Sequence, residues 1–298
     1  MFVIKYKKLF VWLSALFVAL SIASISIFGL KPGIDFKGGS SLELNYPVTR
    51  PTILEVKGAL LNAGFGDASV QPVGEKGFIV KSRSLSEEER ATVVTLAGFG
   101  GSVEVEQKSF TTIGPSVGSE LKKKAIASII LVFIAIILFV AYAFRRVSRP
   151  VSSWKYGLVV ITALIHDIII PSGIFAALGY IYGLEIDILF VVALLTTLGI
   201  SISDTIVVFD RIRENLTAKQ NKPFEQLVGE SLSQTFARSI NTSIVVLLMV
   251  LSLVFFGPKS TQLFSIILAI GMFFGIYSSI FLASPLLVIV EKMQKKPN

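Results

Sequence analysis

The apolar stretch DILFVVALLTTLGISISDTIVVFDRIREN, at residues 187–215, decides the fold of this chain. Its part from 187 to 209 is long enough to cross about 30 Å of hydrocarbon as a helix. Five more runs of this kind cover residues 9–29, 125–144, 156–181, 240–257 and 262–290. Because 53% of the residues are hydrophobic and only 16% are charged, we expect an α-helical polytopic membrane protein with six transmembrane helices.

The basic segments predict how these spans are oriented. They are KYKK at 5–8, RRVSRPVSSWK at 145–155, the loop at 210–238 and EKMQKK at 291–296, and alternating spans place all of them on one side. Since Lys and Arg are retained on the cytoplasmic side, both termini are expected in the cytoplasm. Topology then accounts for the net charge of +8, and no nucleic-acid partner is expected.

Two features of the first half of the chain need separate explanations. Lys122, Lys123 and Lys124 fall on the opposite side, but they end a loop of about 90 residues, and loops longer than about 60 residues are translocated largely regardless of charge. The first run has a basic start and small residues at 21–24, as a signal peptide does. Its length of about 21 residues exceeds the usual 7–15 of a signal h-region, which favours an uncleaved span.

The segment between the first two spans, residues 31–121, is expected to form a small exterior (periplasmic) domain. Alternating patterns predict strands at 40–46, 68–73, 76–82 and 102–110, and helical spacing predicts helices at 51–65 and 84–100. The resulting order βαββαβ is that of an α+β ferredoxin-like domain. The chain is thereby divided into residues 1–30 with the first span, the exterior domain at 31–121, and a helical bundle at 122–298.

Asp204 stands out because it lies inside the fourth apolar run. If Asp210 marks the cytoplasmic edge, Asp204 is about 9 Å deeper at 1.5 Å per residue. An ionisable group at that depth costs about 2.5–3.5 kcal/mol, so it points to a function. The cytoplasmic loop brings Arg238 to the same face, which makes an Asp204–Arg238 pair reasonable. The alternatives are a wet crevice for Asp204 and a topology-setting role for Arg238.

His166 and Asp167 lie about halfway along the third run. Adjacent helical residues diverge by about 100°, so only one of them can point squarely at a given neighbour. Hydrogen bonds to Ser, Thr or backbone groups between helices are the structural alternative for His166. Asp167 is more costly to bury, which favours a functional or water-exposed role for it. Since the chain has a single histidine and no cysteine, no metal site or disulfide is expected.

Further polar residues follow in the fourth and fifth runs. Asn241, Thr242 and Ser243 could hydrogen-bond across spans, although small polar residues commonly serve packing there. The charges expected at the cytoplasmic end of the fourth span are Asp210, Arg211 and Arg213.

Four motifs together resemble the SecF family. They are GIDFKGGSSLEL at 33–44, SDTIVVFDRIREN at 203–215, RSINTS at 238–243 and YSSIFLASPLL at 277–287. The resemblance covers essentially the whole chain, including six spans with one large loop after the first. It implies half of a resistance-nodulation-division type of architecture. In GIDFKGG, we expect the glycines to permit a tight backbone turn, with polypeptide contact by Asp35 or Lys37 as the alternative.

The resemblance implies a function in protein export. It implies use of the proton-motive force, or a sodium gradient in some relatives, to promote late-stage translocation. Carried over to this sequence, the proton-relay carboxylate is Asp204 and its basic partner is Arg238. The implied partners are a SecD-type subunit, the SecYEG channel, unfolded polypeptide and membrane lipid, with YajC and YidC as further candidates. The implied location is the bacterial cytoplasmic (inner) membrane.

Other classes of protein stay open. A passive assembly subunit of the translocon would tolerate neutralisation of Asp204. A small-molecule or lipid exporter of the same superfamily would need a larger exterior domain than about 90 residues can build. An intramembrane aspartyl protease would need a second facing carboxylate, and SISD at 201–204 does not supply its motif. We therefore expect a transport subunit rather than an enzyme, with no cofactor.

Overall fold

The computed structural model describes residues 2–144, 153–218 and 222–295. It divides into two compact units. The helical unit comprises the described parts of 1–30, 128–184 and 189–298, and the sheet unit comprises 31–127 and 185–188. The predicted basic loop at 145–152 lies outside the described residues.

Within the described residues, six helices are long and apolar enough to cross a membrane, which confirms the predicted number of spans. They are α2 (Lys7–Phe28), α6 (Pro115–Ala143), α7 (Ser153–Tyr182), α8 (Ile188–Thr217), α9 (Phe224–Phe256) and a last helix that begins as α10 (Lys259–Tyr277). The last helix continues through a π-helical segment, η2 (Ser278–Ala283), into α11 (Ser284–Lys295). A short helix, α1 (Phe2–Lys5), precedes α2.

Several helices are longer than the apolar runs that predict them. Helix α6 begins at Pro115, so residues 115–121 are helical and continuous with the second span. Helix α8 runs on to Thr217 and α9 begins at Phe224, so the charges between the fourth and fifth apolar runs lie largely on helices. Hydropathy marks the part of a helix suited to hydrocarbon and does not mark where the backbone hydrogen bonding ends.

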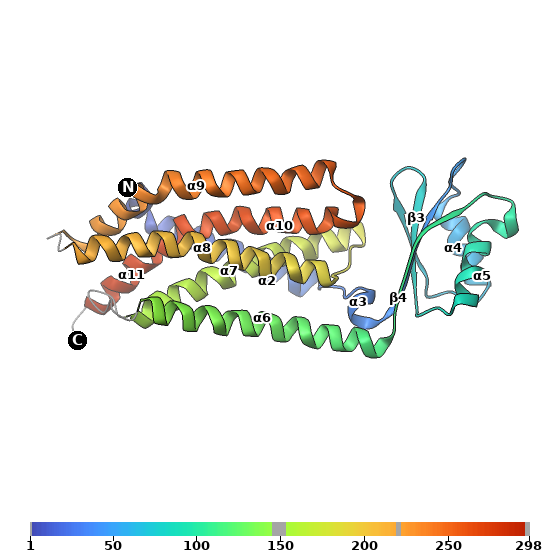
Figure 1. Cartoon of the computed structure of the whole chain (residues 1–298), viewed down its shortest axis with the longest axis horizontal. Coiled ribbons are helices and arrows are strands. Elements are labelled where there is room, and N and C mark those ends of the chain that lie inside the picture. Colours follow the sequence, from blue (N-terminus) through green and yellow to red (C-terminus); the bar gives the residue numbers. More distant parts are fainter. Residues whose placement is uncertain (1, 145–152, 219–221, 296–298) are drawn as a thin grey trace. The chain divides into compact units, whose positions relative to one another are not determined.

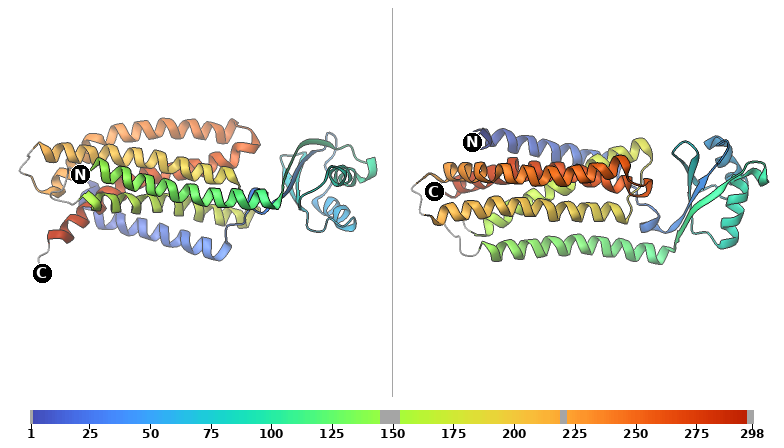
Figure 2. Two further views of the ribbon diagram at one scale, coloured as in Figure 1. Left: turned by 60° about the horizontal axis from the view of Figure 1, so that its bottom comes forward. Right: turned by 45° about the horizontal axis from the view of Figure 1, so that its top comes forward.

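Close helix packing builds the helical unit. Helix α2 packs along α7, and α9 packs along α10 (Figures 1 and 2). At Gly173 of α7 a Cβ would lie 2.4 Å from the Cβ of Ser21, and at Gly271 of α10 one would lie 2.2 Å from Oγ1 of Thr197. Small residues at such crossings let helix backbones approach where lipid supplies no hydrophobic driving force between helices.

One end of the helical unit is held by a carboxylate shared between two lysines. Glu225, at the start of α9, pairs with Lys7 at the start of α2 and with Lys292 of α11, the latter at 2.5 Å. The beginnings of α2 and α9 and the end of the last helix are therefore neighbours (Figure 1).

The sheet unit contains one antiparallel sheet with the strand order β2-β3-β1-β4. Its strands are β1 (Gly39–Asn45), β2 (Ser69–Val73), β3 (Gly77–Ser82) and β4 (Glu106–Ile113). Helices α4 (Ile53–Asn62) and α5 (Glu87–Ala97) complete the order βαββαβ that the sequence predicts. Leu44, Tyr46 and Val56 are fully buried in its separate core.

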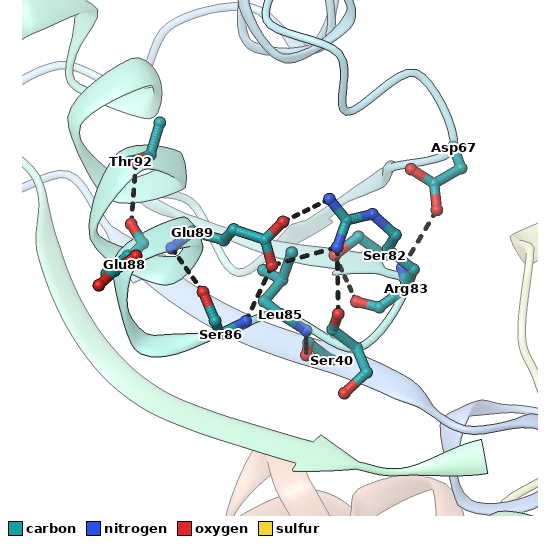
Figure 3. Close-up of polar contacts among 10 residues, drawn as sticks. Ser40, Asp67, Ser82, Arg83, Leu85, Ser86, Glu88, Glu89 and Thr92 are labelled. Carbon is teal, nitrogen blue, oxygen red and sulfur yellow. Dashed lines mark hydrogen bonds and ion pairs between the residues drawn. The ribbon is translucent and has the colours of Figure 1, made fainter.

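Both helices of the sheet unit begin with a reciprocal cap. Thr52 caps α4 together with Glu55, and Ser86 caps α5 together with Glu89. Glu89 also accepts hydrogen bonds from Arg83 at 2.5 and 3.1 Å (Figure 3). The guanidinium of Arg83 and the backbone N–H of Ser86 together lower the pKa of Glu89 to about 2.

The predicted bounds of β4 differ from those in the structure. The sequence predicts this strand at 102–110, whereas it spans Glu106–Ile113. A short turn, η1 (Phe99–Gly101), follows α5, and Phe99 and Gly100 both have positive φ there. The turn and the irregular residues after it occupy the chain up to 105.

The motif GIDFKGG forms the tight turn that the glycines predict. It holds one short helix, α3 (Ile34–Lys37), followed by Gly38 and Gly39 with φ of 79° and 141°. Gly33 has an ordinary φ, but its N–H donates to the carbonyl of Ile186 at 2.8 Å, and a Cβ there would lie 3.0 Å from that oxygen. This glycine is therefore used for close approach rather than for its backbone freedom.

The loop at 185–188 is held to this motif and to the sheet. Glu185 pairs with Lys81 at 2.9 Å and with Lys37 at 3.3 Å. The Asp35 carboxylate accepts a hydrogen bond at 2.9 Å from the backbone N–H of Ile188, the first residue of α8. Asp35 thereby satisfies one of the free donors at the start of that helix.

Candidate functional site

Asp204 lies within α8 and contacts the neighbouring helix α9. Its Oδ2 accepts a hydrogen bond from the Ser243 hydroxyl at 2.6 Å. The side chain is partly buried, and its two flanking residues in the helical turn, Ser201 and Val208, are buried. The carboxylate is therefore presented to a helix interface and not simply to the outside of the bundle.

The structure gives no contact between Asp204 and Arg238, both of which are described. Arg238 lies on α9 and is exposed, and its backbone carbonyl accepts the Thr242 hydroxyl at 2.9 Å. Five residues separate Arg238 from Ser243, which is about 7.5 Å of helix rise. The Asp204–Arg238 pair stays a prediction.

Of the three polar residues at 241–243, the structure uses one for an interhelical bond. Ser243 is buried and binds Asp204, whereas Asn241 and Thr242 are exposed on α9. The Thr242 hydroxyl bonds only to its own helix among the contacts described. Position around the helix, rather than residue type, decides which of them meets the carboxylate.

A second carboxylate, Asp167 of α7, is completely buried. Its Oδ2 accepts hydrogen bonds from the hydroxyls of Ser201 on α8 and Ser278 on η2, the latter at 2.8 Å. Its Oδ1 lies 2.9 Å from Nδ1 of His166, which is 1% exposed. Although adjacent residues diverge around a helix, these two side chains meet each other, and Asp167 joins three helical segments.

The π-helical segment adds a hydrogen-bonded pair of hydroxyls beside Asp167. Ser279 lies 2.8 Å from the Thr205 hydroxyl of α8, and both hydroxyls are near the Ser201 carbonyl, at 3.3 and 3.1 Å. Such π-turns occur frequently at functional sites because they leave a helix carbonyl or side chain out of the regular pattern. The polar residues of α7, α8 and η2 thus form one connected cluster.

The predicted charges at the end of the fourth span form short-range pairs. Arg213 pairs with Asp210, and Arg211 bonds to Glu214 at 2.5 Å and to Gln234 of α9 at 2.6 Å. Only the Arg211–Gln234 bond joins α8 to α9, and the other two pairs lie within α8. They describe a structural role for Asp210, Arg211 and Arg213 in this state of the protein.

Sequence reasoning missed most partners in these contacts. Ser201, Thr205, Ser278 and Ser279 were not singled out, because serine and threonine are frequent in apolar helices and carry no signal of their own. Ser201 and Thr205 are near Asp204 in the sequence, but their hydroxyls bind other residues. Ser278 and Ser279 carry no signal in the sequence, because their contacts depend on which helices lie beside them.

Comparisons with known proteins agree along the whole chain. Residues 95–293 match the family described as "Protein export membrane protein SecD/SecF, C-terminal", and residues 23–46 match the "SecD/SecF GG Motif". The chain is 40% identical to a protein translocase subunit SecF from Thermobaculum terrenum, over 97% of this chain and 93% of the relative. It is 38% identical to the one from Anaerolinea thermophila, over 93% and 92%.

A solved structure shows the same fold. The crystal structure of SecDF, a translocon-associated membrane protein from Thermus thermophilus, aligns with a TM-score of 0.84 and 32% sequence identity. The alignment covers 97% of this chain but only 38% of the SecDF chain. The fold, with carboxylates held between its helices, defines a polytopic export membrane protein of the SecD/SecF class. Within that class, the chain belongs to the SecF family of protein translocase subunits.

Proposed function

We propose that this chain works in a SecDF-type complex in which proton binding at Asp204 couples the proton-motive force to late-stage protein translocation. The observation that carries the proposal is the setting of Asp204, a partly buried carboxylate in a spanning helix with one hydroxyl partner, Ser243, on the next helix. By comparison, the carboxylate of Asp167 accepts hydrogen bonds from two hydroxyls.

The physical basis is the cost of charge inside a membrane. Deprotonated Asp204 can only accept the Ser243 hydrogen bond, whereas the protonated carboxyl can also donate. Proton uptake therefore changes both the charge and the bonding at the α8–α9 interface. One elementary charge moved through 100 mV supplies about 2.3 kcal/mol, which biases a two-state equilibrium roughly fiftyfold.

A SecD-type subunit is the proposed main partner. The chain corresponds to 38% of the SecDF chain, and we propose that a SecD-type half makes up much of the remainder. Arg238 supports a shared site, because it is an exposed cation just before the fifth apolar run, where it is free to pair with an acidic group of a partner subunit. We propose that Arg238 reaches Asp204, or a carboxylate of the partner, in another state of the cycle.

The proposed arrangement places the sheet unit outside the cytoplasm and both termini inside it. The antiparallel order β2-β3-β1-β4 with two helices supports a ferredoxin-like periplasmic domain. The basic ends of the helical unit, including Lys7 and Lys292, support a cytoplasmic location for that end. Translocating polypeptide leaving the SecYEG channel is the proposed substrate, with YajC and YidC as further proposed partners.

Export into sealed inverted membrane vesicles tests this function. After ATP-driven translocation is complete, a trapped reporter precursor should advance only when this chain is present and the proton gradient is maintained. A passive assembly subunit would support the same export with the gradient collapsed. That result would reject ion coupling while leaving a role in the translocase intact.

A further inference from the structure

The proposed coupling at Asp204 leaves the buried pair His166–Asp167 without a role. Both residues are in α7, and they are 1% and 0% exposed. Helix packing could have filled this position with apolar residues at no electrostatic cost. An ionisable pair in the interior of a spanning bundle therefore needs a reason.

One nitrogen of the His166–Asp167 pair has no hydrogen-bond partner among the described residues. Oδ2 of Asp167 accepts from Ser201 and Ser278, and Oδ1 lies 2.9 Å from Nδ1 of His166. In the state in which the pair has a charge of −1, Asp167 is ionised and has no proton to give, so Nδ1 carries the hydrogen and donates it. The lone pair of a neutral imidazole then resides on Nε2, and this buried nitrogen has no hydrogen-bond partner in the described part of the chain.

The surroundings of His166 are aromatic and hold little other charge. Its ring stacks on Tyr277, with centroids 5.9 Å apart and planes at 17°, and it lies edge-on to Phe274 at 6.2 Å. Tyr277 is the titratable group facing it from α10, and its hydroxyl is engaged by Ser14, at 3.4 Å, and by the Phe10 carbonyl, at 3.3 Å.

The other helices around the pair contribute hydroxyls rather than charges at this level. Helix α2 has no charged residue between Lys8 and Lys31, and η2 presents Ser278 and Ser279. On α8 the charged group at this level is Asp204, which bonds to α9 instead. The first charge of α11 is Glu291, roughly three and a half helical turns beyond Ser278.

We propose that His166 and Asp167 form a second proton-binding site of the bundle, in which Nε2 of His166 takes the proton and Asp167 fixes the ring. A hydronium ion gives its proton to Nε2 and leaves a water molecule, and the net charge of the pair changes from −1 to 0. In a low-dielectric interior the neutral ion pair costs less than an uncompensated carboxylate, which favours uptake. Asp167 acts here as a positioning residue.

The contacts of the pair connect it to the turn of α8 that carries the site already proposed. Asp167 is bonded to Ser201, which precedes Asp204 by three residues on α8, and Ser201 in turn accepts from Thr205 and Ser279 at its carbonyl. Any change in these bonds acts on the same turn of α8 that carries Asp204. Proton binding at the two sites is then linked, and linkage is reciprocal. This linkage rests on the proposed function, whereas proton binding by His166 does not.

His166 is the single histidine of the chain, so it can be observed directly. We would label the full chain with ¹⁵N-histidine, place it in lipid nanodiscs and record its ring nitrogens by solid-state NMR from about pH 9 to about pH 5. The neutral form should show a protonated Nδ1 and a bare Nε2, and it should convert to imidazolium within this range. Asp167→Asn should lower the proton affinity of the ring about tenfold, as loss of a facing charge predicts.

The matched control is Ser252→Ala, which removes an exposed hydroxyl of α9 that bonds only to the Met249 carbonyl of its own helix, and it should leave the titration unchanged. A ring that stays neutral throughout, or whose neutral form carries its proton on Nε2, would overturn the proposal. These outcomes need only the unaltered chain, so they hold even if Asp167→Asn does not fold. An unchanged affinity in a folded Asp167→Asn variant would also overturn it.

The result is independent of export. A titrating His166 in a chain whose export does not depend on the gradient would reject the proposed function and keep this site. If export depends on the gradient while His166 stays neutral, the proposed function is kept and this proton-binding site is rejected.

Discussion

Ser243 of α9 donates its hydroxyl to Asp204 of α8 across 2.6 Å, and this bond is the contact that ties the proposed relay carboxylate to the next helix. It makes the α8–α9 interface responsive to a proton, because the ionised carboxylate can only accept from Ser243, whereas the protonated carboxyl can also donate to it.

Ser243→Ala should keep the chain in the membrane and reduce gradient-dependent export about tenfold. A hydrogen bond to a charged group is worth about 1.5 kcal/mol, and the hydroxyl is the sole donor that the described contacts give to Asp204. Ser243→Thr should restore export because it keeps the hydroxyl. Ser252→Ala, on the same helix, is the control for loss of a hydroxyl. Equal export by all three variants would show that this bond has no part in coupling.

Arg238→Ala should reduce gradient-dependent export more than Arg238→Lys does. Lysine keeps the positive charge but loses the planar fork that grips a carboxylate, so an intermediate rate is expected. The rates are compared at matched membrane abundance. If Arg238→Ala exports as well as the parent, the exposed arginine sets topology and does not take part in the relay.

Asp35→Ala should loosen the start of α8. The carboxylate accepts from the N–H of Ile188, and losing an N-terminal cap costs about 1 kcal/mol. Hydrogen exchange at residues 186–190 should quicken roughly fivefold, while Asp35→Asn, which keeps an acceptor oxygen, should change it less. Glu75→Ala, an exposed change in the β2–β3 turn, serves as the control. Unchanged exchange in Asp35→Ala would mean that the loop at 185–188 is held by Lys81 and Glu185 instead.

Acid should weaken the start of α5 through Glu89. Its pKa is lowered from 4.5 to about 2 by Arg83 and the Ser86 N–H, so it contributes stability above about pH 4.5 that disappears as the pH falls through about 2. Hydrogen exchange of the α5 amides, corrected for intrinsic rates, should be faster in Glu89→Gln than in the parent at neutral pH. The two should converge near pH 2. A difference that persists there would assign the effect to geometry rather than to charge.

The sequence predicted the features that repeat along the chain. Six apolar runs and alternating strand patterns report local burial, and they identified the spans and the order βαββαβ. The bounds of β4 were predicted wrongly because Phe99 adopts a positive φ, which the residue pattern does not indicate.

From the sequence, only those site residues could be predicted whose burial in a membrane is energetically costly. Asp167 and Asp204 stand out because carboxylates are rare in apolar runs. Their partners Ser201, Ser243 and Ser278 come from three separate segments, and which serine meets which carboxylate depends on helix rotation and packing. The spacing of charges likewise suggested Arg238 for Asp204, whereas the structure places Ser243 there.

The central claim is that Asp204 changes its protonation during transport, and Asp204→Asn tests it most directly. Asparagine is nearly isosteric and keeps its bonding to Ser243, so folding and partner binding should persist. It cannot bind and release a proton, so gradient-stimulated export of the reporter precursor should be lost, while Asp204→Glu should retain part of it because glutamate titrates in nearly the same range. If Asp204→Asn exports as well as the parent while Asp204→Ala does not, the carboxylate is a structural hydrogen-bonding group and proton coupling at this residue is contradicted.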